Sequence, residues 1–255
     1  MDAYSNVTRF LTTLPCFSGV DTATIRTIAS RCRSMSLRPG QSIFTEGDPC
    51  AHLYILADGR VKCYRASAEG REQILKMFEQ PGDMFCTTSA FSTDLHIVSA
   101  EAMSHVTLYV IDIETMKRAA LDQPAVALAL VTAAGDQMRS LVGLADDLSL
   151  KTATARIAKL LCERARAEGG RNVKDVRLRR DDLREEQIAA IVGAVRVHVS
   201  RSLKALAGMG AITLDRDAIC IADVNALSRF AHAVEPDDRK TRGSSTRSHR
   251  LTTSH

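Results

Sequence analysis

The segment from residue 196 to residue 204 collects side chains that can bind nucleic acid. Arginine can bond guanine O6 and N7 together, serine can bond a base or a phosphate, and lysine neutralises phosphate. Because Val199, Leu203 and Leu206 recur at helical spacing, the polar side chains between them share the opposite face of one helix. The expected DNA-binding residues are Arg196, Val197, His198, Ser200, Arg201 and Lys204.

The helix that carries these residues is predicted to be the second of a pair. Ile188 and Val192 belong to an apolar helix, which a turn at Gly193 separates from a helix over 195–206. Two short helices with facing apolar stripes cross steeply and expose the outer face of the second. Alternating residues around Arg216 predict a wing hairpin. The flanking expectations are a helix over 152–166, a short strand pair over 173–180 and a closing helix over 224–234.

The charge distribution indicates a polyanionic partner for this part of the chain. Residues 1–150 contain 13 Lys and Arg against 17 Asp and Glu, whereas residues 151–234 contain 16 against 10. A basic half beside an acidic half favours nucleic-acid binding. The alternative is a solvated basic face on an ordinary helical hairpin.

A long helix is predicted to begin at Pro124. Its apolar residues recur at alternating spacings of three and four, the pattern of a helix that pairs with another helix. The partner is the same helix of a second copy, this chain's own barrel, or both on different faces of the helix. The expected dimer-interface residues are Val131, Ala134, Met138, Leu141, Ala145 and Leu148.

Short apolar strings punctuated by turn residues over 37–110 predict an antiparallel barrel or jelly roll. Within it, residues 52–65 are expected to form a hairpin that turns at Asp58 and Gly59. The chain has 255 residues, 45% of them hydrophobic and 25% charged, which is typical of a folded soluble protein with two domains. Without a signal-peptide pattern or a long apolar run, we expect it to be cytoplasmic and not membrane-bound.

These elements together resemble the CRP/FNR family of bacterial transcription regulators, on four stretches between residues 15 and 233. They are LRPGQSIFTEGDPCAHLYILADGRVKCY, FEQPGDMF, the long helix, and EEQIAAIVGAVRVHVSRSLKALAGMGAI. The resemblance implies an α+β fold, a homodimer and near-palindromic operators with half-sites one helical turn apart. It implies a cyclic-nucleotide-binding-type β-roll over 1–121, a dimerisation helix over 122–149 and a winged helix-turn-helix over 150–234. The Ser-, Thr- and Arg-rich composition of residues 235–255 predicts a disordered tail.

This sequence departs from the family pattern at residues that would surround the effector and at one residue that would contact DNA. Members that bind cyclic AMP carry a Gly-Glu pair and an Arg-Ser pair around the ligand, but Thr87 and Thr88 stand where the first begins and His96-Ile97 about where the second belongs. A buried cyclic phosphate needs a cationic partner, so we expect a different effector. Val197 replaces a frequent glutamate and could contact a thymine methyl group.

The chemistry of the effector stays open between a heme or gas, a small apolar ligand and thiol oxidation. Seven cysteines without a C-x-x-C pair give no zinc or iron–sulfur motif and favour reduced thiols. A heme needs only isolated His, Cys or Met ligands. The expected effector-pocket residues are Met84, Cys86, Thr87, Thr88, His96, His105 and Met138.

Two other classes of function remain as alternatives. A cupin-like metalloenzyme would need closely spaced histidines and a carboxylate, and the barrel segment has only His52, His96 and His105, without H-x-H, so we expect no enzyme. A sensory subunit that regulates another protein would leave the winged helix-turn-helix unused. The expected partners are double-stranded DNA, a second copy of the chain, a small effector and RNA polymerase, the partner of an activator.

Overall fold

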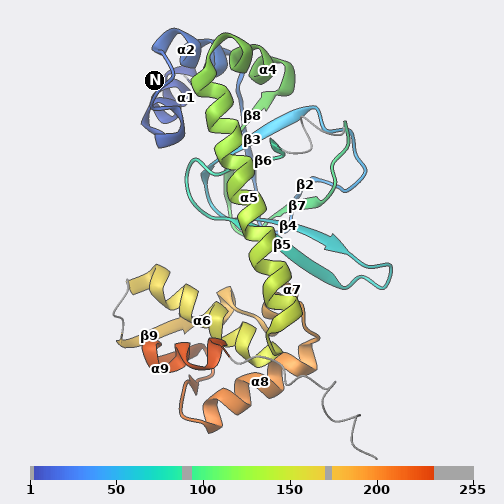
Figure 1. Cartoon of the computed structure of the whole chain (residues 1–255), viewed down its shortest axis with the longest axis vertical. Coiled ribbons are helices and arrows are strands. Elements are labelled where there is room, and N and C mark those ends of the chain that lie inside the picture. Colours follow the sequence, from blue (N-terminus) through green and yellow to red (C-terminus); the bar gives the residue numbers. More distant parts are fainter. Residues whose placement is uncertain (1–2, 88–93, 170–173, 233–255) are drawn as a thin grey trace, which may run out of the picture.

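The computed structural model describes residues 3–87, 94–169 and 174–232. Figure 1 shows two lobes joined by one long helix, α5 (Pro124–Leu150). The expected pocket residue Thr88 and the expected disordered tail 235–255 lie outside the described residues. Within the described ranges, no helix is both long enough and apolar enough to cross a bilayer.

The strands of the first lobe form two four-stranded antiparallel sheets that face each other as a β-roll, as expected. The sheet orders are β1-β8-β3-β6 and β2-β7-β4-β5. Side chains such as Phe44, Phe78, Phe85 and Leu108 fill the space between them, because alternate residues of each strand point inward. The strands are β1 (Arg33–Leu37), β2 (Ser42–Phe44), β3 (His52–Asp58), β4 (Val61–Ala66), β5 (Glu72–Phe78), β6 (Met84–Phe85), β7 (Ser99–Ala102) and β8 (Val106–Asp112).

The turn at Asp58 and Gly59 is not the expected hairpin. The two strands that it joins belong to different sheets, since β3 pairs with β8 and β6, whereas β4 pairs with β5 and β7. Gly59 has a φ of 96°, and a Cβ there would lie 2.2 Å from the His105 carbonyl oxygen. At this turn the chain therefore passes from one sheet of the roll to the other. The prediction of a hairpin over 52–65 was wrong, because turn residues show where the chain reverses direction but not which strand each flanking strand pairs with.

A layer of helices covers the outer face of the sheet that contains β3. Leu53 and Ile55 pack into this layer, whereas the alternate residues Tyr54 and Leu56 face the roll interior. The strand is thus buried on both faces. The first helices of the chain were not predicted from the sequence. The layer consists of α1 (Ala3–Thr13), a 3₁₀ turn (Pro15–Phe17), α2 (Thr22–Arg31) and α4 (Ile113–Asp122), with the first turns of α5 packed against them.

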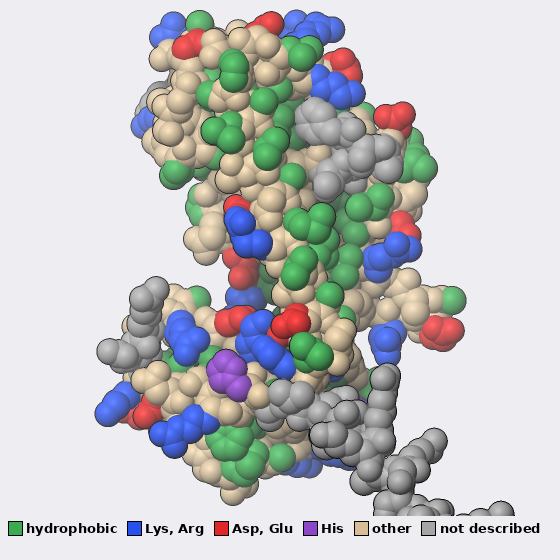
Figure 2. Space-filling model, in the orientation of Figure 1, with side chains coloured by type: hydrophobic (Ala, Val, Ile, Leu, Met, Phe, Trp, Pro, Cys, Tyr) green, Lys and Arg blue, Asp and Glu red, His purple; other side chains and the backbone are tan. Residues whose placement is uncertain are grey.

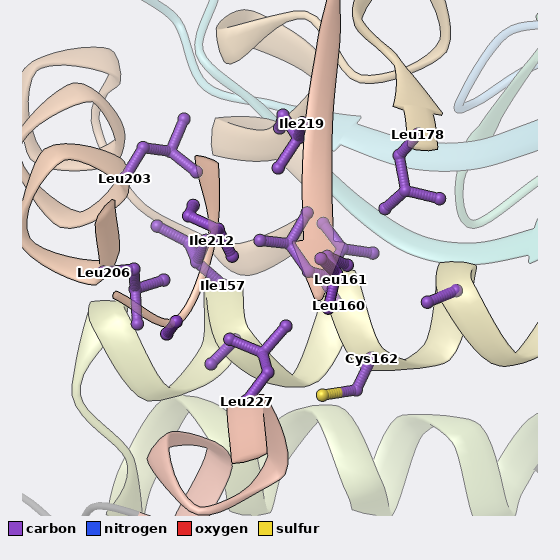
Figure 3. Packing of buried hydrophobic residues seen from close by; sticks show 14 of the residues in the cluster. Ile157, Leu160, Leu161, Cys162, Leu178, Leu203, Leu206, Ile212, Ile219 and Leu227 are labelled. Atoms are coloured by element: carbon purple, nitrogen blue, oxygen red, sulfur yellow. The ribbon is translucent and has the colours of Figure 1, made fainter. Parts of the chain in front are cut away.

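The second lobe is built around one apolar core. Ile157 and Leu161 of α6 (Ala153–Gly169) contribute to this core together with Leu203 and Leu206 of α8 (Arg196–Gly208), as Figure 3 shows. Burying such side chains supplies most of the stabilisation of a small domain. The other helical elements are a 3₁₀ turn (Arg180–Asp182), α7 (Glu185–Val192), α9 (Val224–Ser228) and a 3₁₀ turn (Phe230–His232).

The small sheet of this lobe confirms the wing and corrects another prediction. A hairpin joins β10 (Thr213–Leu214) to β11 (Ala218–Asp223), as expected around Arg216. Residues 173–180, by contrast, contain one strand, β9 (Lys174–Arg179), and not a strand pair. Its partner is β11, about forty residues later in the chain, so the local pattern showed a strand but not what it pairs with.

Candidate DNA-binding and sensor sites

Helices α7 and α8 form the expected helix-turn-helix around Gly193. This glycine ends α7 with a φ of 65°, the left-handed conformation that a residue without a Cβ adopts most easily. Ile188 of α7 and Val199 of α8 are both buried in the core of the lobe. Their packing fixes which face of α8 points outward.

The outer face of α8 gathers the predicted DNA-binding residues. Val199, Ser202, Leu203 and Leu206 are buried on the inner face, so the side chains between them point away from the lobe. Ser200 is half-buried and the other members are exposed. The exposed ones are Arg196, Val197, His198, Arg201 and Lys204.

Arg196 at the start of α8 already has acidic neighbours on α7. Its Nη1 lies 2.8 Å from Glu186 Oε1, and its Nε lies 3.7 Å from Glu185 Oε2. Ion pairs between exposed side chains contribute little free energy. A phosphate or a base can therefore replace these carboxylates around the guanidinium.

Ser202 is a buried polar residue that the sequence analysis missed. Its hydroxyl lies 2.9 Å from the Thr154 hydroxyl on α6, and this hydrogen bond ties α8 to the helix beneath it. The sequence could have indicated that this serine is buried, since Ser202 lies between the apolar residues Val199 and Leu206 on the inner face of the helix.

Side chains of the first lobe contact α7 and α6 of the second lobe directly. Gln73 of β5 donates from Nε2 to the Ala190 carbonyl oxygen at 3.1 Å, near the end of α7. The carboxylate of Glu79 accepts from Arg164 Nη1 at 2.7 and 2.8 Å. A groove of about 740 Å³ between β5, α5 and α6 is lined by this ion pair.

Two expected pocket residues, Cys86 and His96, lie beside a third residue, Cys50. Cys86 Sγ is 3.6 Å from His96 Nδ1, and one ligand-capable atom of each residue lies within 4.8 Å of the other two. The three residues are between 4% and 9% exposed. Burial raises the pKa of the Cys86 thiol, and the hydrogen bond that Cys86 donates lowers the pKa of Cys50. Burial also lowers the pKa of His96, which favours neutral imidazole.

Thr87 and Met84 connect this region to α5. Gln137 of α5 donates from Nε2 to the Thr87 hydroxyl and to the Met84 carbonyl oxygen, both at 3.0 Å. Thr87 is buried. The segment next to the cysteine–histidine cluster is therefore bonded to the long helix.

The structure does not bring His105 and Met138 to this cluster. His105 is exposed in the turn between β7 and β8, at the opposite end of β7 from His96, and Met138 is exposed on α5. The Phe44 ring stacks on His96 with centroids 3.7 Å apart. A heme bound through His96 would therefore require this aromatic ring to move.

An apolar stripe runs along the exposed side of α5, where Figure 2 shows hydrophobic side chains on the surface. Leu128, Val131, Met138 and Val142 are each between 61% and 67% exposed. Leu128 and Val142 were missed in the sequence analysis, although they continue the spacing of three and four from Val131 and Met138. Leu148 is 40% exposed and also packs over Gly193.

Comparisons with known proteins agree with this arrangement. Residues 34–122 match the cyclic nucleotide-binding domain family and residues 155–230 the Crp-like helix-turn-helix domain family. The nitrogen fixation regulation protein FixK of Rhizobium meliloti is 30% identical over 71% of this chain and 78% of its own. The CRP-like cAMP-activated global transcriptional regulator of Mycobacterium tuberculosis is 29% identical over 84% of this chain and 95% of its own. FixK2 from Bradyrhizobium japonicum shares the fold, with a TM-score of 0.66 at 23% identity over 79% of this chain and 98% of that one.

The β-roll, the long helix and the winged helix-turn-helix define a DNA-binding transcription regulator. The chain belongs to the CRP/FNR family of these regulators, which confirms the resemblance seen in the sequence. The expected domain boundaries and the individual DNA-binding, pocket and interface residues stay predictions.

Proposed function

We propose that this protein is a homodimeric, sequence-specific regulator that binds near-palindromic double-stranded DNA through α8 of each copy. The outer face of α8 is the observation that best supports this proposal, because its basic and polar side chains are exposed on a helix whose other face is buried. An α-helix fits the major groove, where such side chains contact base edges. A signal received by the roll sets the DNA affinity, and RNA polymerase is the partner through which binding activates transcription.

A second copy is the proposed partner of the stripe on α5. Val131, Met138 and Ala145 are exposed and seven residues apart, the repeat by which helices pair in coiled coils. A two-fold axis places the same stripe on both sides of such an interface. Two copies of α8 then face two half-sites.

The proposed signal is not cyclic AMP, although one relative is named as cAMP-activated. Among the described residues of the roll, the buried polar or charged ones are Thr87 and His96, and burial favours the neutral form of that histidine. Ile97, about where the family's Arg-Ser pair belongs, is exposed. These residues offer no permanent cation to offset the desolvation of a cyclic phosphate.

The substitution Arg201→Ala tests the proposal. We expect it to weaken binding to a cognate operator by about 1–3 kcal/mol, because a bidentate contact to guanine or a phosphate contact is lost. The operator is first selected from random duplex DNA with the full-length protein, and the affinities are then measured by fluorescence anisotropy at one salt concentration, since phosphate contacts depend on salt.

Arg118→Ala is the matched control, because Arg118 is exposed on α4 in the other lobe. It should leave operator affinity unchanged. Equal binding by wild type and Arg201→Ala would contradict the assignment of α8 as the DNA-reading helix. If the protein bound DNA in none of its effector states, the alternative of a sensory subunit for another protein would replace the proposal.

A further inference from the structure

We propose that Cys50, Cys86 and His96 form a zinc site inside the β-roll, with two thiolates and one imidazole nitrogen as ligands. The three side chains come from separate segments and converge within 4.8 Å. Metal binding at this place does not depend on the proposed DNA-binding function and is tested without DNA.

Backbone hydrogen bonds hold two of the ligands in position. The Cys50 amide donates to the Asp94 carbonyl oxygen, and the His96 amide donates to the Asp48 carbonyl oxygen, both at 2.8 Å. Pro49 and Leu95 form an isolated β-bridge between these two segments. Phe44 stacks on the His96 ring and restricts its rotation. The separation between the two segments is thus fixed before any ion binds.

Cys86 reaches the cluster through an unusual backbone conformation. Its φ of 67° lies in the left-handed region, which residues with a Cβ rarely adopt. Such conformations persist where the surroundings enforce them, and they concentrate at functional sites. Here the conformation accompanies a thiol that lies 3.6 Å from the His96 imidazole.

The ligand types and the burial favour zinc. Two thiolates and a neutral imidazole around Zn²⁺ form a neutral centre, whereas Cu⁺ would leave one negative charge in the buried site. Zinc–sulfur and zinc–nitrogen bonds of about 2.3 and 2.0 Å place tetrahedral ligand atoms about 3.5–3.8 Å apart. The Cys86–His96 distance of 3.6 Å already matches this spacing, and three protein ligands leave the fourth position of a tetrahedral ion open.

A disulfide between Cys50 and Cys86 is the competing use of the two sulfurs. It would leave His96 and its fixed position beside Cys86 without a role, so the three-residue arrangement favours the metal. The experiment below separates the two.

Cobalt(II) chloride is the first probe, added to full-length protein that has been purified with a reductant and freed of metal. We expect one equivalent per chain to produce thiolate-to-cobalt charge-transfer bands and the visible bands of a tetrahedral ion, and zinc chloride to displace it. Cys86→Ser should weaken zinc binding by at least about 100-fold, measured against a chromophoric chelator. Cys63→Ser is the matched control, because Cys63 is buried in the same core but outside the cluster.

A measurement on the wild type covers the case in which Cys86→Ser does not fold. Zinc chloride should slow the alkylation of Cys50 and Cys86, mapped by mass spectrometry, and leave Cys16 and Cys32 unchanged. Absence of thiolate–cobalt bands in the reduced wild type would overturn the site. A Cys50–Cys86 disulfide in oxidised protein, with no metal bound by the reduced protein, would replace it with redox chemistry.

The site also has a path to α5, since Thr87 follows Cys86 and accepts a hydrogen bond from Gln137. Regulation of DNA affinity by zinc along this path rests on the proposed function. We expect zinc chloride to change operator affinity at least threefold in the wild type and less in Gln137→Leu, with metal affinity unchanged. Bound zinc without a change in operator affinity would overturn the coupling but not the site, and no DNA binding with or without zinc would overturn the proposed function instead.

Discussion

Replacing Met138 by aspartate is expected to convert the proposed dimer into monomers and to lower affinity for a two-half-site operator by about 10²–10⁴-fold. Met138 lies in the middle of the exposed apolar stripe of α5. In a two-fold symmetric pair of helices, one substitution places a carboxylate in each copy at the same interface, where both lose water and repel each other. A monomer also loses the gain from binding the second half-site intramolecularly. Light scattering after size-exclusion chromatography gives the mass, and fluorescence anisotropy gives the affinity.

Leu121→Asp is the matched control for this change. Leu121 is 85% exposed on α4, outside the stripe, so the same chemical substitution there should leave both mass and affinity unchanged. A Met138→Asp protein that remains a dimer would show that α5 does not pair through this face. The helix would then connect the two lobes without forming a dimer interface through this face.

The second large effect is expected from Gly193→Val, which should destabilise the helix-turn-helix by about 2–5 kcal/mol. Valine disfavours the φ of 65° at this position, and a Cβ would lie 2.5 Å from Leu148 Cδ2 and 2.6 Å from Gln73 Oε1. The substitution therefore strains the turn and pushes it away from α5 and β5. Urea denaturation gives the loss of stability, and hydrogen exchange shows whether α7 and α8 lose protection.

Gly210→Val separates the two causes of this loss. Gly210 has a similar φ of 71°, but among the described residues no heavy atom other than those of Gly210 and its two chain neighbours lies within 4 Å of the place where its Cβ would stand. Gly210→Val should therefore lower the free energy of unfolding by only about 1–2 kcal/mol, from backbone strain alone. An equal loss in the two variants would mean that the contact of the turn with Leu148 and Gln73 does not contribute.

The helix-turn-helix could be predicted from the sequence because its signals are local. Apolar residues at helical spacing define each helix, and Gly193 lies where α7 ends. Strand pairing depends on distant partners, which local patterns do not reveal. For this reason the strands around Gly59 were recognised as strands but paired wrongly, and β9 was taken for a strand pair.

The cysteine–histidine cluster could not be fully predicted for the same reason, because its residues are distant in the sequence. Cys86 and His96 were predicted to lie near the effector pocket, whereas Cys50 was not singled out, because it is 36 residues from Cys86 in the sequence. The β-bridge between Pro49 and Leu95 and the backbone hydrogen bonds around it bring Cys50 to His96. Metal-binding spacings recognised in sequences describe ligands on one local motif, and this cluster is assembled from three segments.

The rotation of α5 about its own axis is fixed by contacts along its length, of which three are described above. Val126 is buried against the N-terminal helices, Gln137 is bonded to Thr87, and Leu148 packs over Gly193. Inserting one residue between two of these places would turn everything beyond it by about 100° and shift it by about 1.5 Å, so the three contacts could not form together. An insertion of seven residues would nearly restore the phase but move the lobes about 10 Å apart. The length of this helix should therefore vary far less among relatives than the identity of its exposed residues.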